Sequence, residues 1–295
     1  MRDLLAAAAR EKVLLVAFSA PSPAAMAGFA RAARDADAPL LLVRPSGAAE
    51  EKGPAEARDD AAFAEAAFKA AAEIRFQGPM ALLKDPPRAG SSVPDRERVQ
   101  REIDAGFTGV ALAATDSQPD TRDAALAAAA VCQLELGLEV VALGGAAAAA
   151  ELALQLRSRG ATPSAVRITG LEDDAGKLGL AGTALSSATE SLASRLSAIG
   201  IQELVAAGPF LHALRKSAPA EVWATLEGWA SEKGATLEQS AARHQRLLRD
   251  LPAAASDKLE ALCCFAAQDL FSRVGAAGSG TRLVGALLAL HEQDA

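Results

Sequence analysis

The sequence predicts a single (β/α)8 TIM barrel with a helical C-terminal extension. Short apolar runs, typical of strands that are buried on both faces, alternate with longer alanine-rich helical stretches along most of the chain. Eight such runs in strict strand–helix order favour a barrel over a doubly wound open sheet, which usually has fewer strands. After residue 206 the chain carries only helical signals, and these predict the extension.

Length and composition restrict the class of protein further. The chain has 295 residues, of which 51% are hydrophobic and 23% are charged, so it can bury a substantial core and is not a disordered protein. Its net charge is −7, and no run of lysine or arginine reaches four, which argues against a nucleic-acid partner. The apolar stretches are too short to span a bilayer, and the N-terminal segment lacks the features of a signal peptide. We therefore expect a soluble, cytoplasmic protein with no membrane partner.

The expected strands are continuous apolar runs without strict alternation, as strands covered on both faces require. They are residues 12–18, 39–44, 79–84, 109–115, 139–143, 165–169, 177–181 and 201–206.

The expected barrel helices are residues 23–37, 60–75, 95–105, 120–136, 146–159 and 186–199. Ser22 and Pro23 give the first of them a start signal, and Gly106 follows the third where a left-handed residue ends a helix. The connection at 170–176 is too short and acidic for a full helix, so we expect it to be irregular.

Further helices are expected at 220–233, 237–251 and 256–274, followed by a last helix after 275–280. We place the barrel in residues 1–218 and the extension in residues 219–295, within one domain overall. The extension is expected to pack on the barrel or on a partner subunit, and the sequence leaves a homodimer open.

Cysteine and histidine usage predicts neither a disulfide framework nor a metal site. Cys132, Cys263 and Cys264 lie in helical runs without any metal-ligand spacing, so we interpret them as buried, inert thiols in a reducing compartment. The three histidines all follow the last expected strand, at His212, His244 and His291. Without histidines near the strand ends we expect no metal and no other cofactor.

In a TIM barrel the chemistry lies on the loops that follow the strands, so residues at the strand ends are the candidate site. Lys84 and Asp85 end the third expected strand, where a lysine beside a carboxylate can transfer protons or form a Schiff base. The alternative is that Lys84 is only solvated or ion-paired. Ser19 ends the first strand.

Several strand ends also carry groups that suit an anionic ligand. Arg44, Lys84 and Arg167, together with Arg88, can converge at the carboxyl ends of the strands. The alternative is that two of these cations face outward and pair with acidic residues of neighbouring helices. Small residues that could cradle a phosphate at a helix N-terminus follow the last two expected strands. They are Gly182, Thr183, Ser186 and Gly208.

Five segments carry a family resemblance. They read VAFSAPSPAAMAGFARAARDADAPLLLVRPSG (16–47), REIDAGFTGVALAATDS (101–117), GLEVVALGG (137–145), LGLAGTALSSATESLASRLSAIGIQELVAAGPFLHALRK (178–216) and DLFSRVGAAGSGTR (269–282). In this order they resemble the class II ketose-bisphosphate aldolases, the zinc-dependent fructose- and tagatose-bisphosphate enzymes. The resemblance covers most of the chain and implies a barrel that binds a sugar phosphate.

Carried over position by position, the resemblance retains little of the family's metal site. Its strand-three Asp-His pair falls on Asp85 and Pro86, so the acid is kept and the metal ligand is lost. The strand-seven histidine falls on Ala181, and of the following phosphate-binding glycines only Gly182 remains. Glu139 lies near the strand-five ligand, but a single carboxylate does not hold zinc.

The sequence therefore predicts a divergent aldolase-like barrel that binds a phosphorylated sugar or related anion without zinc-dependent aldol cleavage. An alternative is an active carbon–carbon lyase that uses Lys84 and Asp85 as catalytic residues. A second alternative is a non-catalytic partner subunit of an aldolase-type complex.

Overall fold

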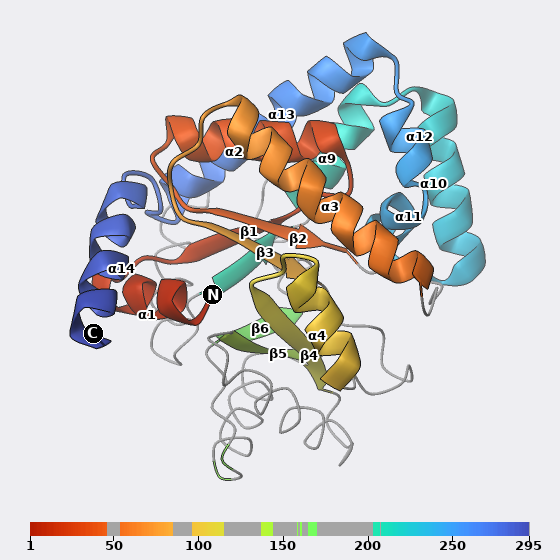
Figure 1. Cartoon of the computed structure of the whole chain (residues 1–295). Helices are drawn as coiled ribbons and strands as arrows, with labels where there is room; N and C mark the ends of the chain where they lie inside the picture. The colour runs from red at the N-terminus through yellow and green to blue at the C-terminus, as the bar shows by residue number, and fades with distance from the viewer. Residues whose placement is uncertain are drawn as a thin grey trace.

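The computed structural model describes residues 1–45, 54–84, 96–114, 137–143, 158, 160, 165–169, 203–206 and 208–294. Its strands form two parallel sheets, one of four strands in the order β3-β2-β1-β7 and one of three in the order β4-β5-β6 (Figure 1). The strands are β1 (Leu15–Ser19), β2 (Leu40–Arg44), β3 (Met80–Lys84), β4 (Gly109–Ala114), β5 (Gly137–Leu143), β6 (Ala165–Thr169) and β7 (Glu203–Ala206).

These seven strands confirm seven of the eight expected ones, because each overlaps one of the apolar runs. The remaining run, residues 177–181, lies outside the described residues, as does the connection at 170–176. Every strand pairing in the two sheets is parallel, as alternating strands and helices require.

The two sheets meet along two edges, where β3 lies beside β4 and β6 lies beside β7. Thr108, the residue before β4, connects the first pair. Its backbone N–H donates to the Leu82 carbonyl oxygen at 2.9 Å, and its hydroxyl oxygen accepts from the Leu82 N–H at 3.0 Å. The described strands therefore follow one another in chain order, which makes this a TIM-barrel-like α/β fold.

Helices surround the sheets and form the C-terminal part of the chain. They are α1 (Arg2–Glu11), α2 (Pro23–Asp35), α3 (Pro54–Glu73), α4 (Arg96–Asp104), α9 (Gly208–Ser217), α10 (Ala220–Lys233), α11 (Leu237–Arg243), α12 (Gln245–Arg249), α13 (Ala253–Arg273) and α14 (Gly280–Asp294). No helix in the part of the chain that the structure describes is long and apolar enough to cross a membrane.

The expected helices at 23–37, 60–75, 95–105, 220–233, 256–274 and the C-terminus are confirmed. The helix expected at 237–251 is divided in two at His244, and α1 and α9 were not expected. The expected helices at 120–136 and 186–199 lie outside the described residues, and of 146–159 only Ser158 is described.

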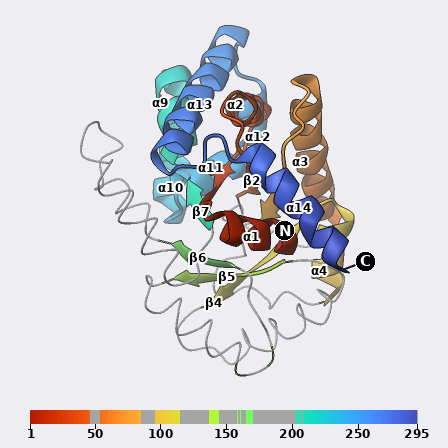
Figure 2. The ribbon, with the colours of Figure 1, turned by 90° about the vertical axis from the view of Figure 1, so that its left-hand side faces the viewer.

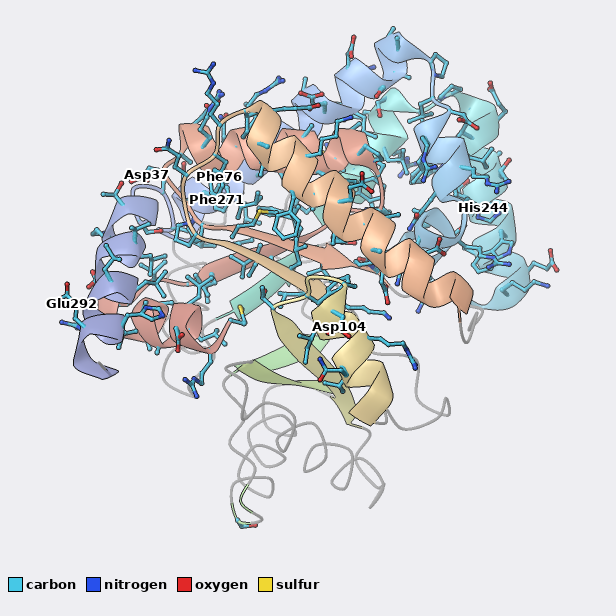
Figure 3. The ribbon with its side chains drawn as sticks, viewed as in Figure 1. Asp37, Phe76, Asp104, His244, Phe271 and Glu292 are labelled. Carbon is cyan, nitrogen blue, oxygen red and sulfur yellow. The ribbon has the colours of Figure 1, made fainter. Side chains whose placement is uncertain are left out.

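The four-stranded sheet has two differently covered faces. Its outer face carries Val16, Phe18, Leu40, Leu42 and Leu82, which pack against α2, α3 and α13. Phe18 stacks on Phe29 of α2 with ring centroids 4.5 Å apart, and its ring meets the edge of Phe271 of α13 at 5.3 Å. Figure 3 labels Phe271 on this side of the sheet. The inner face carries Leu15, Ala17, Leu41, Val43, Ala81 and Leu83, which pack against α1 and α14.

The inner face is turned toward the second sheet. A Cβ atom added at Gly109, the first residue of β4, would lie 3.4 Å from Met1, next to α1. α1 also contacts β5, and α14 lies alongside α1 in both views (Figure 1, Figure 2). Together α1 and α14 thus cover the inner face at the end where the strands begin.

Helices α2 and α13 pack closely against each other. A Cβ atom at Gly28 would lie 2.9 Å from Cys263 Cβ, so only glycine allows this approach. Arg31 of α2 forms an ion pair with Glu260 of α13. Burial raises the pKa of both Cys263 and Cys264, which holds these thiols in their unreactive neutral form.

The last helix is attached to the body of the protein through Asp37, which has a left-handed backbone φ of 45°. The carboxylate of Asp37 accepts hydrogen bonds from the backbone N–H and the hydroxyl of Thr281, both at 3.1 Å. Its carbonyl oxygen accepts from the Gly280 N–H at 2.7 Å. A residue 244 positions away thus caps the start of α14 (Figure 3).

We predict that Asp37→Ala lowers the free energy of unfolding by about 1–2 kcal/mol, because it removes this cap. Asp37→Asn keeps an acceptor and tolerates the left-handed backbone, so its loss is expected to be smaller. Urea denaturation followed by circular dichroism measures both. Asp104→Ala is the control, since Asp104 is exposed and, among the described residues, accepts a hydrogen bond from Gln100 of its own helix. Equal stability of Asp37→Ala and Asp104→Ala would contradict the proposed cap.

Candidate functional site

The carboxyl ends of the parallel strands β1, β2, β3 and β7 meet along one edge of the four-stranded sheet, here called the carboxyl edge. Ser19, Arg44 and Lys84 are the last residues of β1, β2 and β3. This edge is where a TIM-barrel-like fold places its chemistry.

Lys84 is buried in a cluster of opposite charges. Its side chain is only 4% exposed, and its Nζ lies 2.9 Å from Asp60 Oδ2 and 3.2 Å from Glu102 Oε1. Asp60 comes from α3 and Glu102 from α4, the helices that follow β2 and β3. Two carboxylates therefore neutralise and orient a single buried ammonium group.

Arg44 lies directly beside Lys84, because the two residues are partners in the β2–β3 register. Its guanidinium forms an ion pair with Asp60, and it lies 3.9 Å from the more exposed Asp59. Asp60 thus binds both cations. Burial raises the pKa of the Asp60 carboxyl, and the attraction of Arg44 and Lys84 offsets this only in part.

Both cations point away from the inner face. Leu40 and Leu42 belong to the outer face, so Arg44, two residues further along β2, lies on the same side. Lys84 follows Leu82 of β3 in the same way. Their carboxylate partners on α3 and α4 lie on this side as well. Arg44 and Lys84 thus face outward and pair with acidic residues of neighbouring helices, which was the alternative left open by the sequence.

This placement differs from the expected convergence of the two cations, while their roles in anion binding and catalysis stay predictions. Arg44 and Lys84 do not converge on the inner side of the carboxyl edge, where an anion would bind. The Lys84 amine is also directed away from that side, since its Nζ lies against Asp60 and Glu102 among the helices.

Sequence reasoning missed Asp60 and Glu102 as members of the cluster. Asp60 precedes Phe63, Ala64 and Ala67 on α3, all of which face the core. An acidic residue on the core-facing stripe of a helix is a signal for a buried ionic partner.

The other predicted site residues are only partly covered by the structure. Asp85, Gly182, Thr183 and Ser186 lie outside the described residues, as does Arg88. Arg167 lies in β6, opposite Val141 of β5. Gly208 is the first residue of α9, immediately beyond β7.

Ser19 is a polar residue on the inner face. Leu15 and Ala17 belong to that face, so Ser19 lies on it at the carboxyl edge. The side chain has no exposed surface, and its hydroxyl oxygen has no hydrogen-bond partner among the residues that the structure describes. Its register partner on β2 is the apolar Val43.

The residues described by the structure do not fit a zinc site. They contain no group of three His, Cys, Asp or Glu side chains that could hold a metal ion. His212 lies on α9, His244 between α11 and α12, and His291 on α14, far from one another along the chain. Partial burial lowers the pKa of His212, and the neighbouring Lys216 and Arg215 lower it further.

We predict that Lys84→Met lowers the free energy of unfolding by about 3–5 kcal/mol, because it leaves buried carboxylates without their cation. Urea denaturation measures the loss. Lys69→Met on α3 is the matched control, since Lys69 is exposed and pairs only loosely with Glu73. The double variant Lys84→Met/Glu102→Gln is expected to recover part of the stability. If Lys84→Met were as stable as Lys69→Met, the charge cluster would not hold this edge.

A second prediction concerns pH. Because burial raises the folded-state pKa of Asp60, the folded protein takes up this proton more readily than the unfolded chain. The stability of the wild type relative to Asp60→Asn should therefore increase as the pH falls through the folded-state pKa. The gain should level off below the ordinary value of 3.8. Denaturation of both proteins over a pH series measures the difference, and a relative loss on acidification would refute the prediction.

Comparison with known proteins shows a likeness at the level of fold. No protein-family model and no curated protein matches the sequence. Among solved structures, the YdjI aldolase from Escherichia coli K12 is similar with a TM-score of 0.59 at 12% sequence identity, over 95% of this chain and 98% of that one. A putative fructose-1,6-biphosphate aldolase from Coccidioides immitis is similar with a TM-score of 0.56, also at 12% identity, over 94% and 96% of the two chains. The chain therefore has an aldolase-like α/β fold.

Proposed function

We propose that this chain is a divergent aldolase-fold protein that binds a sugar phosphate or a related anion and lacks zinc-dependent aldol cleavage. The observation that supports the proposal most is the position of Lys84. Lys84 is the last residue of β3 and precedes the two positions on which the family's acid and metal ligand fall, and its side chain belongs to a buried ionic cluster.

Aldol cleavage needs an electron sink at the substrate carbonyl, either a metal ion or a lysine Schiff base. Lys84 is held against α3 and α4 by Asp60 and Glu102, so it is not available for a Schiff base on the inner face. The described residues also offer no set of ligands for zinc. The described part of the carboxyl edge therefore favours binding over catalysis.

The start of α9 favours an anionic ligand. α9 begins at Gly208, directly beyond β7, and the preceding residue is Ala207, which has no side-chain oxygen to cap the helix. A helix N-terminus carries partial positive charge and N–H groups outside the helical ladder, of which α9 lacks the one at Pro209. TIM barrels also commonly bind phosphate after their last strands. We place the phosphate there, with Arg167 and the small residues Gly182, Thr183 and Ser186 as further contacts.

Calorimetric titration with inorganic phosphate and with fructose 1,6-bisphosphate tests the binding. A retro-aldol assay on fructose and tagatose bisphosphates, with and without zinc, tests the chemistry. We expect saturable binding of both anions and no turnover in either assay. Metal-dependent turnover would overturn the proposed loss of cleavage, and the absence of any binding would overturn the proposed ligand class.

Gly208→Asp tests the location of the phosphate. A carboxylate in the first turn favours the helix but repels an incoming anion, so we expect phosphate affinity to fall at least about tenfold while the protein stays folded. Gly228→Asp is the matched control, because Gly228 lies on α10 with open space around it. Equal affinities for the two variants would place the anion elsewhere.

A further inference from the structure

The Ser19 hydroxyl is a buried polar group that the described residues leave without a partner. It lies at the end of β1, with β2 on one side and β7 on the other. The next residue, Ala20, donates its N–H to the Val43 carbonyl oxygen at 3.1 Å, so the backbone on the far side of Ser19 is also held in place. The hydroxyl therefore has a fixed position on the inner face.

A buried hydroxyl without a partner lowers the stability of the folded protein. A buried hydroxyl that lacks a hydrogen bond destabilises the folded state, whereas alanine or valine at the same place would not. Ser22, three residues later, is equally buried but caps α2 by accepting from the Ala25 N–H at 3.3 Å. Ser19 thus differs from Ser22 in having no structural task among the described residues.

We propose that the Ser19 hydroxyl binds a neutral oxygen, a hydroxyl or a carbonyl, on the carbon chain of the ligand. This inference rests on the proposed binding of a sugar phosphate. It adds to the phosphate site a second contact on the inner face, which selects for a polyol or keto chain.

The register of the strands supports binding of the ligand's phosphate at α9 and of its carbon chain at Ser19. Phe18 of β1 is opposite Ala206, the last residue of β7, and neighbouring strands lie about 5 Å apart, so β1 ends beside the strand that precedes α9. A ligand whose phosphate binds at the start of α9 can therefore extend its carbon chain over β1.

The surroundings of Ser19 favour a neutral oxygen over a charged group. The neighbouring inner-face residues Ala17, Val43 and Leu83 are apolar, and the nearby cations Arg44 and Lys84 point to the other side of the sheet. A charged group here would have no described counter-ion. A serine hydroxyl both donates and accepts, which suits either a hydroxyl or a carbonyl oxygen.

Ser19→Ala tests the inference through two readouts that should move in opposite directions. Without ligand, the variant is expected to melt at the same temperature as the wild type or higher, because it loses an unpaired buried hydroxyl. Its dissociation constant for fructose 1,6-bisphosphate is expected to rise about three- to tenfold through the loss of one hydrogen bond. Its dissociation constant for inorganic phosphate should stay unchanged, since that probe has no carbon chain.

Ser22→Ala is the control. It should melt at a lower temperature through the lost helix cap and bind both probes as the wild type does. If Ser19→Ala binds both probes like the wild type, or melts well below it, the inference is overturned while the phosphate site stands. If the wild type binds neither probe, both the proposed function and this inference fail.

Discussion

The alternation of side chains along a strand is the constraint on which the rest of this structure depends. Successive residues of β2 point to opposite sides of the sheet. Leu40 and Leu42 face the helices α2 and α3, whereas Leu41 and Val43 face the second sheet. The same parity places Arg44 and Lys84 among the helices and Ser19 on the inner face. A shift of one residue in any of these strands would exchange charged and apolar groups between two sides that tolerate them very differently.

Much of the fold could be predicted because its signals are local. The apolar run at 165–169 was predicted as a strand and the segment 220–233 as a helix, and the structure has both elements with those same ends. The helices α1 and α9 were missed for a physical reason, since Met1 provides no side-chain cap for α1 and the residue before α9 is an alanine. Where a cap exists, as at Ser22, the start of the helix was predicted correctly.

The site was harder to predict because β2 and β3 are apolar on both faces. A half-exposed strand shows its inward side by alternating polar and apolar residues, but a run such as Leu40–Arg44 contains no such pattern. The sequence therefore placed Arg44 and Lys84 at the right edge without indicating the face. The face on which the two cations lie was indicated by the helices. Asp60 and Glu102 occupy core-facing helix positions, and a buried carboxylate requires a cation as its partner.

Polar side chains at the carboxyl edge are ion-paired on the outer face, whereas on the inner face the Ser19 hydroxyl has no described hydrogen-bond partner. On the outer face, Arg44 and Lys84 each have a carboxylate partner, so this network holds α3 and α4 against the sheet, although Arg44 Nε has no described hydrogen-bond partner. On the inner face, the Ser19 hydroxyl has no hydrogen-bond partner among the residues that the structure describes. A buried hydroxyl without a hydrogen bond costs stability, so our proposal gives the Ser19 hydroxyl a ligand to bind. Our proposal therefore assigns recognition to the inner face, whereas the described contacts of Arg44 and Lys84 join the sheet to its helices.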